Sequence, residues 1–278
     1  MLLLADAGST KIQWATLHEG KVASEFVSAG INPCLLSPGQ LRDALGEALH
    51  ETADMVIDHV VYYGAGCLPE VCPAVADTLR DITGCREAEV YSDMLGAARA
   101  LCGHNPGIAA ILGTGANSCY FDGNEIKANT PPLGFILGDE GSGARLGIAL
   151  VNGVLKGYFP AHIADLFAAE TGLDKAGIIR RVYREAAPNA FLASLTRFIG
   201  RHISEPALEE MVVREFMFFF ERNVLYAYPS ELPVHFTGSI AAAFERQLRE
   251  AADAVALYIG RIEARPMPLL IRYHLSES

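Results

Sequence analysis

Short apolar runs that end in glycine-rich turns occur three times along the chain. Residues 2–5 lead into 6–11, 108–112 lead into 113–117, and 234–236 lead into 237–239. An apolar run of this length is typical of a buried strand. Glycine lets the backbone approach an anion closely, so that N–H groups and hydroxyls reach phosphate oxygens. One such turn is weak evidence, but three of them predict a nucleotide held between two lobes.

In the first hundred residues, apolar positions alternate between strand and helix periods. The spacing of Leu41, Leu45 and Leu49 predicts an amphipathic helix, and Ser92 is placed to cap another helix. The pattern predicts strands at 2–5, 12–17, 21–28, 56–63 and 89–91, and helices at 37–51, 68–82 and 92–101.

A cluster of breakers at 102–107 marks the best candidate boundary, and the strand, turn and hairpin pattern restarts after it. We expect one strand that ends at Leu112, a second at 232–237 and a third near 255–259. Helices are expected at 141–156, 240–251 and 267–275, with mostly helical structure at 160–230. The chain is therefore expected to be a duplicated α/β unit. Its domains would be 1–103 and 104–278, and the last helix is free to pack back on the first domain.

Composition narrows the class of protein. The chain has 278 residues, 51% hydrophobic and 20% charged, which is typical of a soluble globular protein. Its net charge of −11 argues against binding nucleic acid or an anionic membrane. The six cysteines form no C-x-x-C pair, and no apolar run reaches the roughly 18 to 20 residues of a membrane span. We therefore expect a cytoplasmic protein with reduced thiols.

Two aspartates follow predicted strands. Asp6 stands beside the first glycine turn, where a carboxylate is well placed to hold Mg²⁺, directly or through water. Asp93 lies in the first turn of a predicted helix, where it could accept a proton from a substrate hydroxyl. Turn capping and interaction with the helix dipole are the structural alternatives.

Other polar positions are less decisive. Residues 138–143 place two acids between glycines before a helix, which favours contact with a polar ligand over simple capping. Asn32 precedes a proline and by itself predicts a turn. The eight histidines lack zinc-site spacing, and the phenylalanines at 216 and 218–220 are expected in the core.

Together these motifs resemble the acetate-kinase, sugar-kinase, Hsp70 and actin superfamily, and within it the N-acetylglucosamine kinase and BadF-type ATPase branch. Residues 6–11 match the first phosphate motif, 112–118 the second and 236–243 the adenosine motif. Residues 133–143 match the connecting segment characteristic of this branch, and 91–97 match the segment with the catalytic aspartate. The resemblance implies two ribonuclease-H-like, actin-like ATPase lobes with a nucleotide cleft between them.

The resemblance also implies roles for individual residues. It assigns ATP and Mg²⁺ as cofactors, Asp93 as the base that acts on the sugar 6-hydroxyl, and Asp6 as the metal site. The sugar would be bound by Asn32, Asp93, Ala116, Asn117, Gly134 and Asp139. The nucleotide would be bound by Gly8, Ser9, Thr10, Lys11, Gly113, Thr114, Gly115, Gly238, Ser239 and Ala242.

Two departures from the family pattern concern the acceptor. Leu133 replaces a tryptophan that packs near the sugar, and Ala144–Arg145 replace an aromatic pair of bacterial relatives. The expected function is an ATP-dependent kinase that phosphorylates an amino sugar, N-acetylglucosamine at O6. A BadF-type activator ATPase and a nucleotide-dependent binding protein are the alternatives. The expected partner is a small-molecule sugar, and a homodimer stays open.

Overall fold

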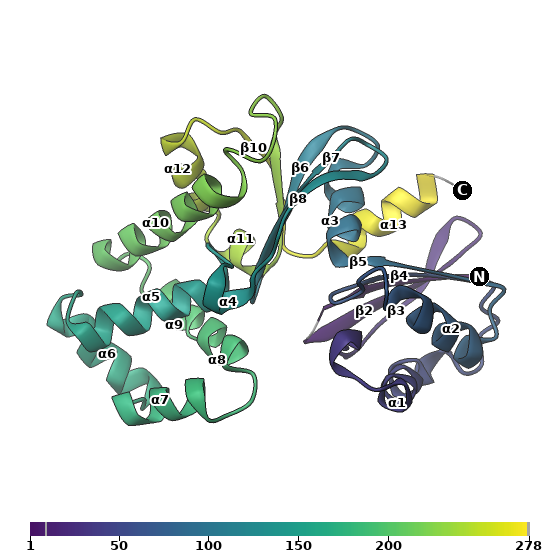
Figure 1. The fold of residues 1–278 in the computed structure, drawn as a ribbon, viewed down its shortest axis with the longest axis horizontal. Coiled ribbons are helices and arrows are strands. Elements are labelled where there is room, and N and C mark those ends of the chain that lie inside the picture. Colours follow the sequence, from purple (N-terminus) through teal and green to yellow (C-terminus); the bar gives the residue numbers. More distant parts are fainter. Residues whose placement is uncertain (9, 277–278) are drawn as a thin grey trace. The chain divides into compact units, whose positions relative to one another are not determined.

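A computed structural model describes residues 1–8 and 10–276, and the chain divides into two compact units (Figure 1). Unit 1 comprises Met1–Asn105, Gly123–Glu125 and the chain from Arg265 onward. Unit 2 comprises Pro106–Asp122 and Ile126–Ala264. The C-terminal segment therefore returns to the unit that contains the N-terminus.

Unit 1 is built on a five-stranded mixed sheet in the order β3-β2-β1-β4-β5. The first three strands form antiparallel pairs, whereas β4 and β5 run parallel to β1. Parallel pairing places the carboxyl ends of β1, β4 and β5 at one edge. The strands are β1 (Leu2–Ala7), β2 (Lys11–His18), β3 (Lys21–Ala29), β4 (His59–Gly64) and β5 (Glu87–Ser92).

Helices cover both faces of this sheet, with α1 and α2 on one face and α3 and α13 on the other (Figure 1). Ser92 accepts a hydrogen bond from the Leu95 N–H and so caps α3, as predicted. Ser37 and Gln40 form a capping box at the start of α1. The helices are η1 (Pro33–Leu35), α1 (Pro38–Ala48), η2 (His50–Thr52), α2 (Cys72–Thr83), α3 (Asp93–Cys102) and α13 (Met267–Ser276).

Unit 2 contains a second five-stranded sheet, in the order β10-β9-β6-β7-β8. The strands β6, β7 and β8 form antiparallel pairs, whereas β9 runs parallel to β6 and β10 runs parallel to β9. The two sheets thus correspond strand for strand, which confirms the expected duplicated α/β unit. The strands are β6 (Gly107–Leu112), β7 (Ala116–Phe121), β8 (Ile126–Thr130), β9 (Val234–Thr237) and β10 (Ile259–Glu263).

The helices of unit 2 bury a large apolar core. Phe216, Phe219 and Phe220 are fully buried in it, as predicted, whereas Phe218, also expected in the core, is only partly buried. Phe219 and Phe220 contact Phe236 of β9. The helices are α4 (Gly134–Leu137), α5 (Gly143–Lys156), α6 (Ala161–Thr171), α7 (Lys175–Tyr183), α8 (Pro188–Ser194), α9 (Thr196–Arg201), α10 (Pro206–Asn223), α11 (Ser239–Ala243) and α12 (Glu245–Ala254).

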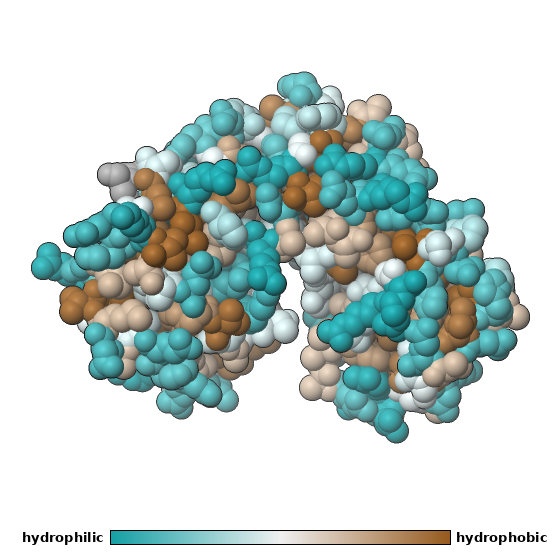
Figure 2. Space-filling view, turned by 180° about the vertical axis from the view of Figure 1, so that it is seen from behind, coloured by the Kyte–Doolittle hydropathy of each residue, from teal (hydrophilic) through white to brown (hydrophobic). Residues whose placement is uncertain are grey.

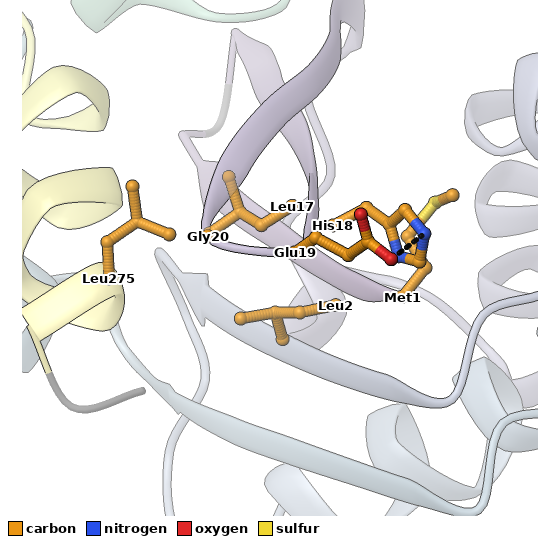
Figure 3. A pocket seen from close by; sticks show the side chains of 7 residues that line it. All are labelled: Met1, Leu2, Leu17, His18, Glu19, Gly20 and Leu275. Carbon is orange, nitrogen blue, oxygen red and sulfur yellow. Dashed lines mark ion pairs between the residues drawn. The ribbon is translucent and has the colours of Figure 1, made fainter.

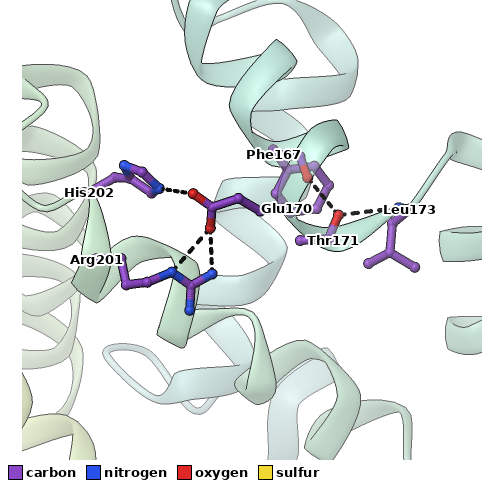
Figure 4. Close-up of polar contacts among 6 residues, drawn as sticks. All are labelled: Phe167, Glu170, Thr171, Leu173, Arg201 and His202. Carbon is purple, nitrogen blue, oxygen red and sulfur yellow. Dashed lines mark hydrogen bonds and ion pairs between the residues drawn. The ribbon is translucent and has the colours of Figure 1, made fainter.

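Polar contacts also join helices within this region (Figure 4). Glu170 of α6 accepts a hydrogen bond of 3.1 Å from Arg201 Nε and lies 2.6 Å from His202 Nε2. The Arg201 hydrogen bonds lower the pKa of Glu170, and His202 adds to this effect. Because Arg201 is 55% exposed, we expect its ion pair with Glu170 to contribute little, and the apolar core to contribute most of the stability of this packing.

Two expectations about elements were wrong, and one element was missed. The helix expected at 240–251 is divided into α11 and α12, because Phe244 leaves helical geometry while its side chain stays in the core. The last strand begins at Ile259, because Ala256 adopts a positive φ of 56° and turns the chain first. The short helix α4 was not expected at all, since four residues carry no readable period.

The molecular surface carries both hydrophobic and hydrophilic residues. Figure 2 shows hydrophobic residues as separate patches between hydrophilic ones on the face drawn. Leu133, Ile136 and Leu137 are among the exposed apolar residues. Within residues 1–8 and 10–276, no helix is long and apolar enough to cross a membrane.

Candidate functional site

The first glycine turn joins β1 to β2 in unit 1. The Gly8 N–H donates a hydrogen bond of 3.0 Å to the Lys11 carbonyl oxygen and closes the turn. Thr10 and Lys11 are exposed. Ser9, predicted to bind nucleotide, lies outside the described residues. The turn thus offers a hydroxyl and an ammonium group to a ligand approaching from solvent.

Asp6 and Asp93 lie close together at the carboxyl edge of the unit 1 sheet. Asp6 is the penultimate residue of β1, and Asp93 follows β5 as the first residue of α3. Burial raises the pKa of Asp6 to about 7, the charge of Asp93 adds to the rise, and Lys11 opposes it. The structure therefore brings together the predicted metal ligand and the predicted base.

The carboxylate of Asp93 is oriented by its own helix. The Met94 N–H donates a hydrogen bond of 2.8 Å to Asp93 Oδ1, and the N–H of Asp93 itself also bonds the carboxylate. Burial nevertheless raises the pKa of Asp93 above its usual range. A carboxylate can accept about four hydrogen bonds, so capacity is left for a substrate hydroxyl.

The Asp6–Asp93 pair fits a divalent cation. Burial is the main cause of the raised pKa of Asp6, repulsion by the Asp93 carboxylate adds to it, and Lys11 opposes it only in part. Mg²⁺ prefers carboxylate oxygens and water as ligands. Asp6 is therefore a suitable residue to hold Mg²⁺ in unit 1.

Asn32 stands in the loop after β3. Its Oδ1 accepts a hydrogen bond of 3.2 Å from the Cys34 N–H and caps η1, so the turn predicted for Asn32 is confirmed. The side chain also lies against Gly66, where an added Cβ would come within 2.2 Å of Oδ1. Because Gly66 follows β4 by two residues, Asn32 lies near the edge that carries Asp6 and Asp93.

In unit 2 the second and third glycine turns pack directly against each other. The Gly113 N–H bonds the Gly115 carbonyl at 3.0 Å and closes the second turn. Gly238 has a φ of +116°, and a Cβ there would lie 2.3 Å from the Leu112 carbonyl oxygen, so only glycine fits. Ser239 opens α11, and the Ala242 N–H bonds the Gly238 carbonyl at 3.2 Å.

The N-terminus of α5 forms hydrogen bonds to the second turn. The Gly143 N–H donates to the Gly113 carbonyl oxygen at 2.8 Å, and the Ala144 N–H donates to that of Thr114 at 3.1 Å. Two N–H groups of the helix terminus are satisfied in this way. The carbonyl groups of the turn are therefore held by α5, and the conformation of residues 113–115 is fixed.

Asp139 lies on the second turn. The N–H groups of Ala116 and Gly134 donate to its carboxylate, and burial still raises its pKa. A Cβ on Gly115 would lie 3.0 Å from Asp139 Oδ2, so the close approach depends on glycine. Asp139 adopts a φ of 58°, a strained conformation that is retained mainly at functional sites.

Several residues around Asp139 and Asn117 had no sequence signal. Glu140 Oε1 lies 2.8 Å from Arg222 Nη1, and its Oε2 lies 3.4 Å from Asn223 Nδ2, at the end of α10. Asn129 of β8 donates a hydrogen bond to Asn117. These partners are distant in sequence, and no spacing rule could have identified them.

The positions that depart from the family pattern have separate environments. Leu133 is 58% exposed, whereas Ala144 is fully buried in the core of unit 2. Arg145 Nε lies 3.8 Å from Glu215 Oε2 on α10, and burial raises the pKa of Glu215. Arg145 therefore compensates a buried acid.

A hollow in unit 1 lies at the first hairpin and does not coincide with the predicted site (Figure 3). It contains the ion pair of His18 and Glu19, whose atoms are 3.9 Å apart. The lining residues are Met1, Leu2, Leu17, His18, Glu19, Gly20 and Leu275. None of them belongs to the three glycine turns of the predicted nucleotide site or carries a predicted role.

Comparison with solved structures places this geometry in a family. A provisionally named N-acetylglucosamine kinase of Porphyromonas gingivalis is 44% identical, with 99% of each chain covered and a TM-score of 0.94. Another of that provisional name, from Chromobacterium violaceum, is 17% identical, covers 98% of each chain and has a TM-score of 0.67.

A more distant structure shares only the fold. The ROK family glucokinase of Streptomyces griseus, solved with glucose and AMPPNP, is 16% identical over 98% of this chain and 97% of its own, with a TM-score of 0.57. No family model and no curated protein matches the chain. The two actin-like α/β units and the match over nearly the full length agree with each other. The chain belongs to the N-acetylglucosamine kinase and BadF-type ATPase branch of the acetate-kinase, sugar-kinase, Hsp70 and actin superfamily.

Proposed function

We propose that the protein is an ATP-dependent sugar kinase that phosphorylates an amino sugar, N-acetylglucosamine at O6. The observation that carries the proposal is the pair Asp6 and Asp93 at the carboxyl edge of β1, β4 and β5. A base for the acceptor and a ligand for a cation then lie side by side. The name of the 44% identical relative supports the choice of sugar.

Asp93 acts as the base in this proposal. Its raised pKa makes the ionised carboxylate a stronger proton acceptor than an exposed aspartate. The O6–H bond breaks as its proton moves to the Asp93 carboxylate, and O6 forms a bond to the γ-phosphorus. The bond from that phosphorus to the bridging oxygen breaks with its electron pair, and ADP leaves.

The glycine turns hold the nucleotide. Thr10 and Lys11 in unit 1, and Thr114 and Gly115 in unit 2, bind phosphate oxygens, and Gly238 and Ser239 border the adenosine. Hydrogen bonds fix the conformation of residues 113–115, so the backbone N–H groups of Thr114 and Gly115 need not reorganise during the reaction. Mg²⁺, held by Asp6 directly or through water, would neutralise phosphate charge when bound.

Polar side chains recognise the acceptor. Asn32, Asn117 and Asp139, with the backbone of Gly134 and Ala116, hydrogen-bond the sugar. An unpaired polar group in such a site costs about 1 to 3 kcal/mol, so epimers that misplace one hydroxyl should be poor substrates. Leu133 offers less contact than an aromatic ring, which predicts a modest affinity for the sugar.

A coupled ADP-release assay tests the proposal. The acceptor panel is glucose, glucosamine, and N-acetylated glucosamine, mannosamine and galactosamine, each with ATP and Mg²⁺. We expect the strongest stimulation by N-acetylglucosamine, with the new phosphate on O6 by ³¹P–¹H correlation NMR. ADP release that no sugar stimulates would reject the kinase and favour an activator ATPase. Nucleotide binding without turnover would favour a binding protein.

A further inference from the structure

Two asparagine side chains, Asn117 of β7 and Asn129 of β8, face each other on neighbouring strands of the unit 2 sheet. The register of β7 and β8 pairs Cys119 with Asn129, so Asn117 stands two residues away on the same face. Asn129 Nδ2 donates a hydrogen bond of 2.8 Å to Asn117 Oδ1. Diagonal cross-strand pairs of this kind lie within reach of each other's side chains.

Backbone partners fix which way each amide points. The Ser118 N–H can only donate, and it lies 2.9 Å from Asn117 Oδ1, so that atom must be the oxygen. Asn129 Nδ2 lies 2.6 Å from the Ser118 carbonyl oxygen and 3.2 Å from that of Thr130, which can only accept. Turning either amide over would place like groups against each other.

This arrangement determines what Asn117 offers a ligand. Its Oδ1 already accepts two hydrogen bonds, from Ser118 and Asn129. Among residues 1–8 and 10–276, no partner accepts from its Nδ2. Asn117 therefore presents a hydrogen-bond donor, although a free asparagine side chain could present a donor or an acceptor.

The position of Asn129 is itself anchored. The neighbouring Thr130 donates from its N–H to the Tyr228 hydroxyl at 2.8 Å, and from Oγ1 to the Asn223 carbonyl at 3.0 Å. Ser118 Oγ donates to that same carbonyl at 3.2 Å. The end of α10 and the residues that follow thus hold the edge strand in place, and with it the amide of Asn129.

We propose that Asn129 is a positioning residue that locks the Asn117 amide with its N–H groups toward the acceptor. The proposal rests on the proposed sugar-kinase function. The atom that faces Asn117 must then accept a hydrogen bond, as a hydroxyl or an acetamido carbonyl oxygen does. An ammonium group cannot accept one, so an unacetylated amino sugar with its nitrogen at this point would be excluded.

Steady-state kinetics with Asn129→Ser test the role. The shorter side chain loses the bond to Asn117, so the KM for the amino sugar should rise about tenfold, while kcat and the KM for ATP stay within about twofold. Asn189→Ser, on α8 in the same unit, is the matched control and should match the wild type. A fall in kcat, or an equal rise in the KM for ATP, would contradict the proposal.

A double-variant cycle separates positioning from a general structural effect. If Asn129 acts through Asn117, then Asn129→Ser should add no further rise in KM to an Asn117→Ala protein. Factors that multiply in the double variant would show that Asn129 acts elsewhere and would overturn the proposal.

Hydrogen exchange of the side-chain amides gives a test without substrate. In the free protein, ¹⁵N NMR should show the Asn129 Nδ2 protons exchanging more slowly than those of Asn189. Equal exchange would remove the amide lock whatever the activity. If the wild type showed a slow Asn129 amide but phosphorylated no sugar, the proposed function alone would fail.

Discussion

The two units share one sheet topology but differ in what surrounds the glycine turn between their first two strands. In unit 1 the turn is exposed at Thr10 and Lys11, and the main feature beside it is a pair of partly buried carboxylates. In unit 2 the turn is held from several sides, by α5, by Gly238 and by Asp139.

This difference indicates how the two units of a duplicated fold can take different roles. Acids whose pKa values are raised by burial occur in both units, but in unit 1 two of them, Asp6 and Asp93, lie close enough for the charge of Asp93 to raise the pKa of Asp6 further, which suits proton transfer and cation binding. Unit 2 keeps a turn whose hydrogen bonds are already made, which suits recognition without reorganisation. The chemistry therefore depends on the neighbours of each turn, and the fold alone does not determine it.

Removing the basicity of Asp93 should have the largest effect. Asp93→Asn keeps the size of the side chain, so ATP and sugar should still bind, while kcat falls about 10² to 10⁴-fold. Asp43→Asn, on the exposed surface of α1, is the control and should retain normal turnover. Near-normal kcat in Asp93→Asn would exclude Asp93 as the base and remove the contrast between the units.

Changing Asp139 should affect binding instead of chemistry. Asp139→Asn tolerates the left-handed backbone at φ 58° but sets an amide against the N–H groups of Ala116 and Gly134. We expect the KM for the sugar to rise about 10- to 100-fold. Nucleotide affinity, measured by calorimetry, should change little. A selective loss of ATP binding would place Asp139 at the nucleotide.

Two neighbouring glycines allow a finer test of the second turn. Gly115→Ala places a Cβ about 3.0 Å from Asp139 Oδ2, whereas at Gly113 an added Cβ meets nothing within 4 Å. Gly115→Ala should therefore raise the KM for the sugar about 3- to 10-fold, and Gly113→Ala much less. Equal effects of the two substitutions in the kinetic assay would mean that Asp139 does not depend on the space at Gly115.

How much of this was predictable differs between local and distant contacts. The strands next to the glycine turns and the cap at Ser92 follow from hydrophobic period and capping chemistry, and both were predicted. The proximity of Asp6 to Asp93 could be anticipated, because parallel strands end at one edge. Asn129 bonds Asn117, 12 positions away, and Glu140 bonds Arg222 and Asn223, 82 and 83 positions away. No hydrophobic period or motif predicts these hydrogen bonds.

The smallest predicted effect concerns stability in unit 2. Hydrogen bonds from Arg222 and Asn223 lower the pKa of Glu140 below its ordinary value of 4.5, even though burial opposes this. The ionised Glu140 carboxylate therefore contributes to the free energy of unfolding above about pH 4.5. This contribution is lost as the pH falls through the lowered pKa of Glu140 in the folded protein. Since the Arg222 side chain is 55% exposed, we expect Glu140→Gln to cost only about 1 kcal/mol at neutral pH.

Urea unfolding at several pH values measures this effect. The difference between wild type and Glu140→Gln should shrink as the pH falls well below 4.5. Glu221→Gln, an exposed neighbour on α10, should show no such trend. A difference that stays constant with pH would mean that the charge of Glu140 does not stabilise the unit.

The division of labour between the units is tested most directly by single-turnover rates at saturating sugar, measured for Asp93→Asn and Asp139→Asn in parallel. Saturation compensates for weak binding but cannot replace a missing base. We predict that Asp139→Asn recovers to within about tenfold of the wild-type rate, while Asp93→Asn stays about 10² to 10⁴-fold slower. Recovery of Asp93→Asn, or failure of Asp139→Asn to recover, would contradict the assignment of the base to Asp93 in unit 1 and of sugar recognition to Asp139 in unit 2.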